Sequence, residues 1–151
     1  MNSRSKSRQL ALQVLYQADV GIPLDPQGSF ELVDESPSEE RVRSFAREIA
    51  RGCLEQRAGI DAVLARCARN WTPARMPVLD RNVMRIGIWE LLFGGEISPA
   101  VAIDEAVELA KRFGTAESGA FVNGVLDRVA GEREGLRQEF KVAEGSCSRK
   151  P

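Results

Sequence analysis

The fifteen-residue stretch Leu79–Phe93, LDRNVMRIGIWELLF, constrains the fold most, because apolar residues fall on nearly every face of the helix that it would form. A helix that is apolar all round is usually buried inside a fold. This one is too short, and too charged in its first half, to span a bilayer. Gly87 lies halfway along it, at a cost of about 1 kcal/mol relative to alanine, which indicates that another helix crosses closely there. Gly94 and Gly95 are expected to end the helix, since glycine adopts left-handed backbone without a steric clash.

Apolar residues recur at the helical period over most of the remaining chain, and no alternating strand pattern occurs. The fold is therefore predicted to be all-α, a compact bundle of about seven helices joined by short loops. The helices are expected at residues 10–20, 39–58, 60–71, 79–93, 99–113 and 116–130, with one short turn near 30–33 in a connector at 21–38. We expect one domain, residues 1–140, followed by a disordered C-terminal tail at 141–151.

Local signals refine these helices. The residues expected to cap helix N-termini are Ser38, Ser98 and Thr115. Gly59 is expected to separate two helices, and Gly119 and Gly124 to thin the last helix for close packing. Trp71 and Phe113 continue the apolar stripes of their helices, so both are expected to face the core.

The composition offers no support for catalysis, because the chain contains no histidine. Histidine is the commonest general base and metal ligand, and the usual partner of a nucleophilic serine or cysteine. Neither of the glycine-rich phosphate motifs, GxxxxGKS/T and GxGxxG, occurs. Cys53, Cys67 and Cys147 form no CxxC pair and no even disulfide set, so they are interpreted as reduced thiols. We therefore expect no catalytic residue, cofactor or metal site, in a cytoplasmic protein without a secretory signal or membrane span.

Basic residues are concentrated at the N-terminus, although the net charge is only −1. Arg4, Lys6 and Arg8 precede the first acidic residue, Asp19, and serines lie between them. This tip is predicted to be basic and flexible. Two functions remain open for it: a solvated tail, or an arm that binds the phosphates of a nucleic acid.

The two helices that meet at Gly114 also suggest a helix-turn-helix that binds DNA. The second helix would then need arginine, glutamine or asparagine in its first turns to read base edges. Residues 116–120 provide one carboxylate and small side chains instead. This pattern disfavours a DNA-reading function.

Several separated sequence blocks agree in order with one known family. They are AIDEA at Ala102–Ala106, ELAK at Glu108–Lys111, FG at Phe113–Gly114, FVNGVLD at Phe121–Asp127, RQLALQVLYQ at Arg8–Gln17 and RIGIWEL at Arg85–Leu91. Together they strongly resemble the NusB family of transcription antitermination factors. The resemblance spans roughly residues 4–131.

The resemblance implies a compact all-helical fold of two small sub-bundles. It also implies binding of the boxA segment of leader RNA, as a single strand, together with the ribosomal small-subunit protein that doubles as NusE. The pair would be loaded onto RNA polymerase to suppress termination, notably in ribosomal RNA operons.

The resemblance further implies two sets of site residues. The positions that match RNA contacts in the family are Arg4, Lys6, Arg8, Glu117, Phe121 and Asn123. The positions that match the protein partner, or its seam with RNA, are Tyr16, Asp80 and Arg85. Basic side chains would neutralise phosphates, and the Phe121 ring would stack on an unstacked base. A core position for Phe121 is an equal alternative, and Asp80 is alternatively a helix cap paired with Arg85.

Two other functions remain as alternatives. The same helical module occurs at the front of some ribosomal RNA cytosine methyltransferases, but this sequence has no Gly-rich βα unit for a methyl-donor cofactor. Catalysis would therefore need a separate chain. The other alternative is a helical scaffold that forms a homodimer through an apolar surface.

Overall fold

The computed structural model describes residues 2–21, 31–69, 71–95 and 97–148, and within these ranges the chain forms helices and no strand. The α-helices are α1 (Ser3–Asp19), α2 (Glu31–Asp34), α3 (Glu40–Glu55), α4 (Arg57–Cys67), α5 (Val78–Phe93), α6 (Pro99–Phe113), α7 (Ser118–Gly131) and α8 (Arg133–Ser148). A short 3₁₀-helix, η2 (Pro73–Arg75), precedes α5. The all-α prediction is confirmed.

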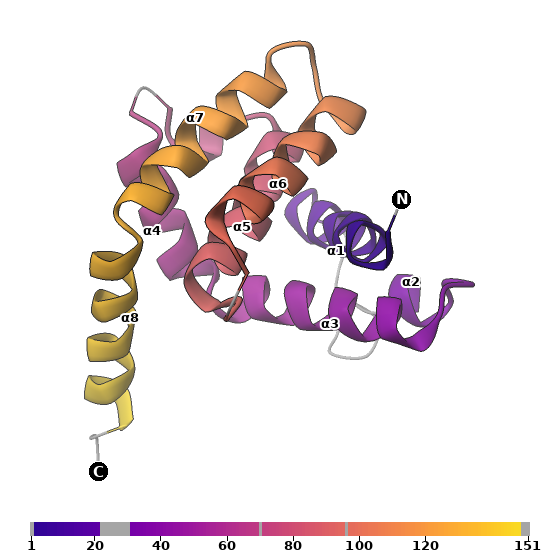
Figure 1. Cartoon of the computed structure of the whole chain (residues 1–151), viewed down its shortest axis with the longest axis horizontal. Coiled ribbons are helices and arrows are strands. Elements are labelled where there is room, and N and C mark those ends of the chain that lie inside the picture. The colour runs from indigo at the N-terminus through magenta and orange to yellow at the C-terminus, as the bar shows by residue number, and fades with distance from the viewer. Residues whose placement is uncertain (1, 22–30, 70, 96, 149–151) are drawn as a thin grey trace.

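Helix α5 lies at the centre of the fold, in contact with α1, α3, α4, α6, α7 and α8 (Figure 1). Every residue from Asn82 to Leu92 is buried. A Cβ atom on Gly87 would lie 2.6 Å from Cδ1 of Leu126, so the missing side chain lets α7 cross closely. After Phe93 the chain turns through Gly95, whose φ is +73°. The core-helix prediction is confirmed, and no helix in the described ranges has the length and apolarity to cross a membrane.

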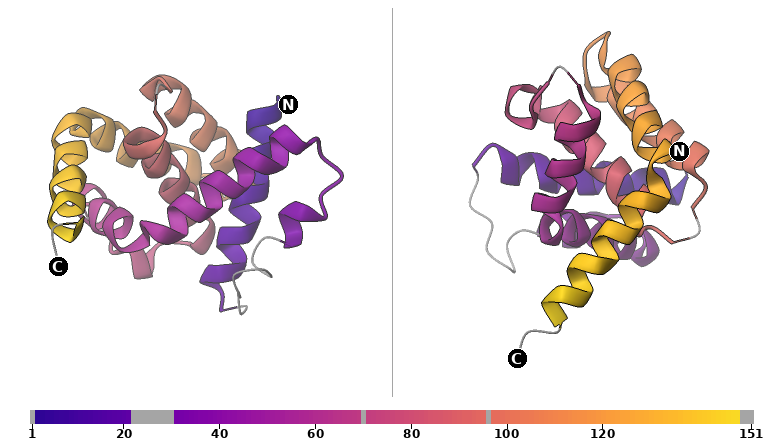
Figure 2. Two further views of the ribbon diagram at one scale, coloured as in Figure 1. Left: turned by 90° about the horizontal axis from the view of Figure 1, so that it is seen from below. Right: turned by 90° about the vertical axis from the view of Figure 1, so that its left-hand side faces the viewer.

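The other helices form two groups around α5. Helices α1, α2 and α3 pack on one another, and α4, α6 and α7 pack with α5. Figure 2 shows α3 crossing α1 at an angle. At this crossing the Ser7 hydroxyl donates to the carbonyl oxygen of Val42 at 2.7 Å. This arrangement corresponds to the two small sub-bundles that the sequence resemblance implied.

Helix α8 extends away from the body of the fold (Figure 1). Leu136 is buried, and the Phe140 ring meets the Phe93 ring edge-on with centroids 5.0 Å apart. These contacts anchor the first half of α8, and the helix continues to Ser148. The structure therefore differs from the expected disordered tail over residues 141–148, while 149–151 lie outside the described residues.

The break between the third and fourth helices lies at Gln56 rather than at Gly59. Gly59 lies inside α4, where an added Cβ would come within 2.5 Å of the Phe140 ring. The prediction was wrong because this glycine makes room for a neighbouring side chain instead of ending a helix.

Only one of the three predicted caps is present. The Ser98 hydroxyl accepts the backbone N–H of Val101 at 3.2 Å, as expected. For Ser38 and Thr115 the prediction was wrong, because α3 and α7 are each preceded directly by a glutamate whose side chain makes no capping hydrogen bond.

The N-terminal tip is helical rather than flexible. Helix α1 begins at Ser3, and the side-chain oxygen of Asn2 accepts the backbone N–H of Ser5 at 2.8 Å. This bond satisfies one of the free amides at the start of the helix. The three basic residues near the N-terminus therefore project from a formed helix.

Two aromatic residues expected in the core are exposed instead. Trp71 is 48% exposed and Phe113 is 43% exposed. Each lies at or just beyond the end of its helix, where the helical period no longer indicates whether a neighbouring element covers the side chain. Both residues consequently belong to the surface.

Candidate nucleic-acid and protein interface

The basic residues near the N-terminus have different environments. Arg4 and Lys6 are exposed on α1, and the Arg4 guanidinium lies 4.3 Å from the centroid of the Phe45 ring. The first turn of α1 contains no acidic residue. Arg8 is only 1% exposed. The structure therefore leaves Arg4 and Lys6 accessible to phosphates, but not Arg8.

Arg8 forms a buried ion pair with Glu90 of α5. Its Nε donates to both carboxylate oxygens at 3.0 Å, and its Nη2 lies 2.8 Å from Oε1. A second carboxylate, that of Glu105 in α6, lies 3.5 Å from Nη1. Burial raises the pKa of Glu90, and the hydrogen bond and charge of Arg8 oppose the rise. A direct phosphate contact by Arg8 does not fit this geometry, in which Arg8 fixes α1 to α5 and α6.

Tyr16 borders a shallow apolar groove between α1 and the ends of two other helices. The groove has a volume of about 250 Å³ and is lined by Gln9, Leu12, Gln13, Tyr16, Gln17, Leu79 and Phe113. Tyr16 and Phe113 are each 43% exposed. We call this surface the Tyr16–Phe113 groove. Exposed aromatic residues beside an apolar depression are the usual anchors of a protein interface, so Phe113 joins Tyr16 as a candidate partner residue that the sequence did not indicate.

Arg85 is buried in a polar network. It donates to both carboxylate oxygens of Asp61, at 2.7 and 2.9 Å, and to Asp19 Oδ2 at 3.0 Å. Asp19 also accepts from Arg81 at 2.7 Å and from Asn82 at 2.9 Å. Burial raises the pKa of Asp19, but these hydrogen bonds and arginine charges outweigh it, so the pKa is lowered overall. The network joins α1, α4 and α5, and Arg85, 5% exposed, is occupied within it.

Asp80 is also buried, at 4% exposure, in the first turn of α5. Its Oδ1 has no hydrogen bond with any described residue. The residue that precedes α5 is Pro77, and no side chain caps the helix. Asp80 is therefore not the cap of α5, and it is not paired with Arg85, which donates to other acceptors.

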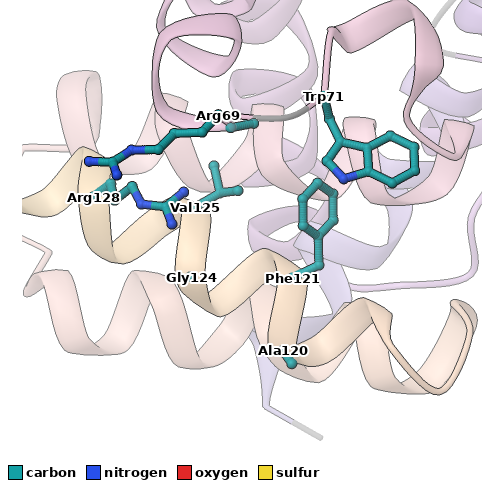
Figure 3. Close-up of a pocket in the computed structure, with 8 residues that line it drawn as sticks. Arg69, Trp71, Ala120, Phe121, Gly124, Val125 and Arg128 are labelled. Carbon is teal, nitrogen blue, oxygen red and sulfur yellow. The ribbon is translucent and has the colours of Figure 1, made fainter.

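Phe121 lines a pocket between α7 and residues of the segment that follows α4 (Figure 3). The pocket has a volume of about 460 Å³, and its prominent lining residues are Arg69, Trp71, Phe121, Gly124 and Arg128. We call it the aromatic–arginine pocket. The Phe121 and Trp71 rings have centroids 6.1 Å apart and planes inclined at 58°. Phe121 is half-buried, so it is neither a fully buried core residue nor a free platform.

The other two residues predicted on α7 do not join this pocket. Asn123 is exposed, and residues two apart on a helix point to different sides, so it faces away from Phe121. Glu117 is exposed before α7, and its carboxylate accepts from the Thr115 hydroxyl at 3.2 Å. The predicted RNA-binding residues are therefore divided among α1, the aromatic–arginine pocket and the outer side of α7.

The cysteines offer no reactive group in the described residues. Cys53 and Cys67 are free and buried, as predicted, and burial raises the pKa of both thiols. The side chain of Cys147 lies outside the described part. The described residues contain no cluster of three His, Cys, Asp or Glu side chains that could hold a metal ion.

Comparison with known sequences gives one consistent family. The NusB family model matches residues 5–131, which include α1 from Ser5 onward and all of α2 to α7. The transcription antitermination protein NusB of Sorangium cellulosum is 45% identical over 130 residues, covering 86% of this chain and 93% of that protein. Its counterpart in Pelotomaculum thermopropionicum is 42% identical over 147 residues, covering 97% and 99%.

Comparison with solved structures gives the same family. T. maritima NusB matches with a TM-score of 0.77 and 37% identity, over 86% of this chain and 92% of that chain. A crystal structure of the antitermination factors NusB and NusE in complex with dsRNA matches with a TM-score of 0.77 and 25% identity, over 87% and 98%.

Proposed function

The chain belongs to the NusB family, and on that premise we propose that it binds boxA-type leader RNA together with the ribosomal protein NusE and is loaded onto RNA polymerase, notably at ribosomal RNA operons. The observation that carries the proposal is the match over most of both chains to curated transcription antitermination proteins. These relatives are named as transcription antitermination proteins and not as enzymes, in agreement with the expectation that this chain acts by binding. Such a factor is expected in the cytoplasm.

The neighbouring complex of NusB, NusE and dsRNA supports both partners. On this chain, Arg4 and Lys6 supply accessible cations for phosphates. The Tyr16–Phe113 groove supplies the exposed aromatic side chains for the protein partner. Arg8 and Arg85 act as positioning residues, because both are buried and paired with carboxylates.

Binding of a labelled boxA-type RNA, with and without purified NusE, tests the proposal across a salt series. For single strands log K falls with log salt by about 0.7 for each neutralised phosphate. The double variant Arg4→Ser/Lys6→Ser should therefore flatten the slope by about 1.4. Arg41→Ser/Lys141→Ser is the matched control, because both of its residues are exposed on other helices.

One result would overturn the whole proposal, and another would overturn only the role that it gives to Arg4 and Lys6. Absence of binding to RNA and to NusE, separately and together, would remove it entirely. An unchanged salt slope in Arg4→Ser/Lys6→Ser would remove the role of these two residues. Unfolding curves of all variants confirm that the fold is retained, since exposed side chains contribute little to stability.

A further inference from the structure

We propose that Asp19 is a positioning residue for the protein partner: it holds the last turn of α1, which carries Tyr16, against α5, so that the Tyr16–Phe113 groove is already formed when the partner arrives. This inference rests on the proposed function, since it assumes that the groove receives NusE. It adds a residue that does not line the groove but on which the affinity of the groove depends.

Asp19 is the last residue of α1, three residues after Tyr16. Its side chain is only 7% exposed. The Oδ2 atom accepts hydrogen bonds from Arg81 at 2.7 Å, from Asn82 at 2.9 Å and from Arg85 at 3.0 Å. All three donors belong to the first two turns of α5. A single carboxylate oxygen therefore joins the C-terminal end of α1 to the N-terminal end of α5.

The same helix ends supply walls of the groove. Tyr16 comes from the last turn of α1, Leu79 from the first turn of α5, and Phe113 is the last residue of α6. Asp19 joins α1 to α5 within three residues of Tyr16 on one helix and of Leu79 on the other. These bonds consequently fix how the tyrosine side of the groove lies relative to the leucine side.

The position of Asp19 is unfavourable for α1 considered alone. The C-terminal end of a helix carries a partial negative charge, which favours basic and disfavours acidic side chains. The last turn of α1 contains no basic residue that would compensate. The contacts with α5 therefore explain the acidic residue, and an intrinsic preference of the helix does not. Helix ends fray when nothing holds them, so these contacts also keep Tyr16 in place.

The charges around Asp19 make its removal specific. Its Oδ1 atom lies 3.4 Å from Nη2 of Arg57 in α4, so three arginines surround the one carboxylate. The other carboxylate of the network, that of Asp61, is paired with Arg85. An asparagine at position 19 would keep the size of the side chain but leave three arginines with one carboxylate. The donors of Arg81 and Arg85 would then no longer attract the end of α1.

The test compares Asp19→Asn with Asp61→Asn as its matched control. Asp61 also accepts from Arg85, at 2.7 and 2.9 Å, but these bonds join α4 to α5 and do not involve α1. Both variants lose a charged acceptor, and only Asp19→Asn releases α1. Its affinity for NusE, measured by calorimetry, should fall about 5- to 150-fold, the usual range of coupling between two sites. The affinity of Asp61→Asn should stay within about twofold, as expected for independent sites.

Two further measurements separate positioning from a general loss of stability. Asp19→Asn should have little further effect on NusE affinity in a chain that carries Tyr16→Ala, because the positioned side chain is then absent; independent effects would multiply instead. The chain contains one tyrosine, so incorporation of 3-fluorotyrosine gives a single fluorine resonance in NMR. This resonance should shift or broaden in Asp19→Asn and remain unchanged in Asp61→Asn.

A second variant approaches the same contact from α5. Arg81→Gln removes the donor that lies 2.7 Å from Asp19 and should weaken NusE binding in the same direction as Asp19→Asn. The double variant Asp19→Asn/Arg81→Gln should bind no more weakly than the weaker of the two single variants, since both remove one contact. Unfolding curves set the temperature at which every variant is folded.

The outcomes separate this inference from the proposed function. If the unmodified chain fails to bind NusE, the proposed function fails. If it binds NusE and Tyr16→Ala weakens binding, while Asp19→Asn and Arg81→Gln bind as tightly as the unmodified chain, only the positioning role is refuted. Equal losses of affinity in Asp19→Asn and Asp61→Asn, or a fluorine resonance that Asp19→Asn leaves unchanged, would also refute that role.

Discussion

Replacement of Arg8 by methionine should destabilise the protein strongly, because it leaves a buried carboxylate without its partner. The side chains of Arg8 and Glu90 are 2% and 1% exposed, so water cannot replace the lost guanidinium. Removal of one member of such a buried pair costs about 3–5 kcal/mol, out of a total stability of about 5–15 kcal/mol. At about 2–4 °C for each kcal/mol in a chain of this length, the midpoint of thermal unfolding should fall by about 6–20 °C.

The loss should depend on pH. Burial raises the pKa of Glu90, and removal of Arg8 takes away the contributions that oppose the rise. A carboxyl whose pKa is higher in the folded state binds more protons there, so stability falls as pH rises from the unfolded pKa to the folded one. The deficit of Arg8→Met should therefore be smaller at pH 5 than at pH 8.

Urea unfolding followed by circular dichroism at both pH values measures these changes. Arg8→Met/Glu90→Leu should recover most of the loss, because an apolar pair avoids the buried charge. Arg4→Met is the matched control on the exposed side of the same helix. A deficit below about 1 kcal/mol in Arg8→Met, or a deficit that grows toward acid pH, would refute this reasoning.

Three other perturbations have defined outcomes. Asp19→Asn should cost about 1.5–3 kcal/mol at pH 7, since Asp19 accepts charged hydrogen bonds. Folding lowers the pKa of Asp19, so the stabilisation from its carboxylate is lost as the pH falls below the ordinary pKa of an aspartate. The stability of Asp19→Asn, measured by urea unfolding, should therefore change less toward acid pH than that of the unmodified chain. Gly87→Ala should lower the thermal midpoint, because its Cβ would lie 2.6 Å from a leucine methyl, with an overpacking cost of about 1–3 kcal/mol. Gly124→Ala should raise the midpoint, because a Cβ at that position would meet no atom within 4 Å. Equal shifts in the two variants would contradict this difference between the two glycines. Tyr16→Ala and Phe113→Ser should each weaken NusE binding at least 30-fold by calorimetry if the groove anchors the partner, whereas unchanged affinity would assign NusE to another surface.

The central helix could be predicted from sequence because its apolar residues cover every face, a pattern that only burial explains. The helix boundary at Gly59 could not, because a glycine that ends a helix and one that accommodates Phe140 look the same in a sequence. In the same way, the sequence around Gly124 of α7, which is open, does not distinguish it from Gly87 of α5, which is packed.

The candidate site was only partly predictable. Arg8 was grouped with Arg4 and Lys6 by charge, yet it falls in helical register with the buried Leu12 and Leu15, a signal that was present in the sequence. Its partner Glu90 is 82 residues away, and no local pattern indicates that pairing. The exposure of Trp71 likewise depends on how α7 lies against the end of α4, which the helical period does not specify.

The ion pair between Arg8 and Glu90 has a consequence for recognition. A disordered arm would lose backbone entropy worth about 1–2 kcal/mol for each residue that it immobilises on a ligand. Here the residues from Ser3 to Arg8 are already helical and held against the core, so that loss is incurred on folding instead of on binding. A preorganised helix with two accessible cations can consequently retain more of its gross interaction energy as affinity than a longer flexible arm with the same charges.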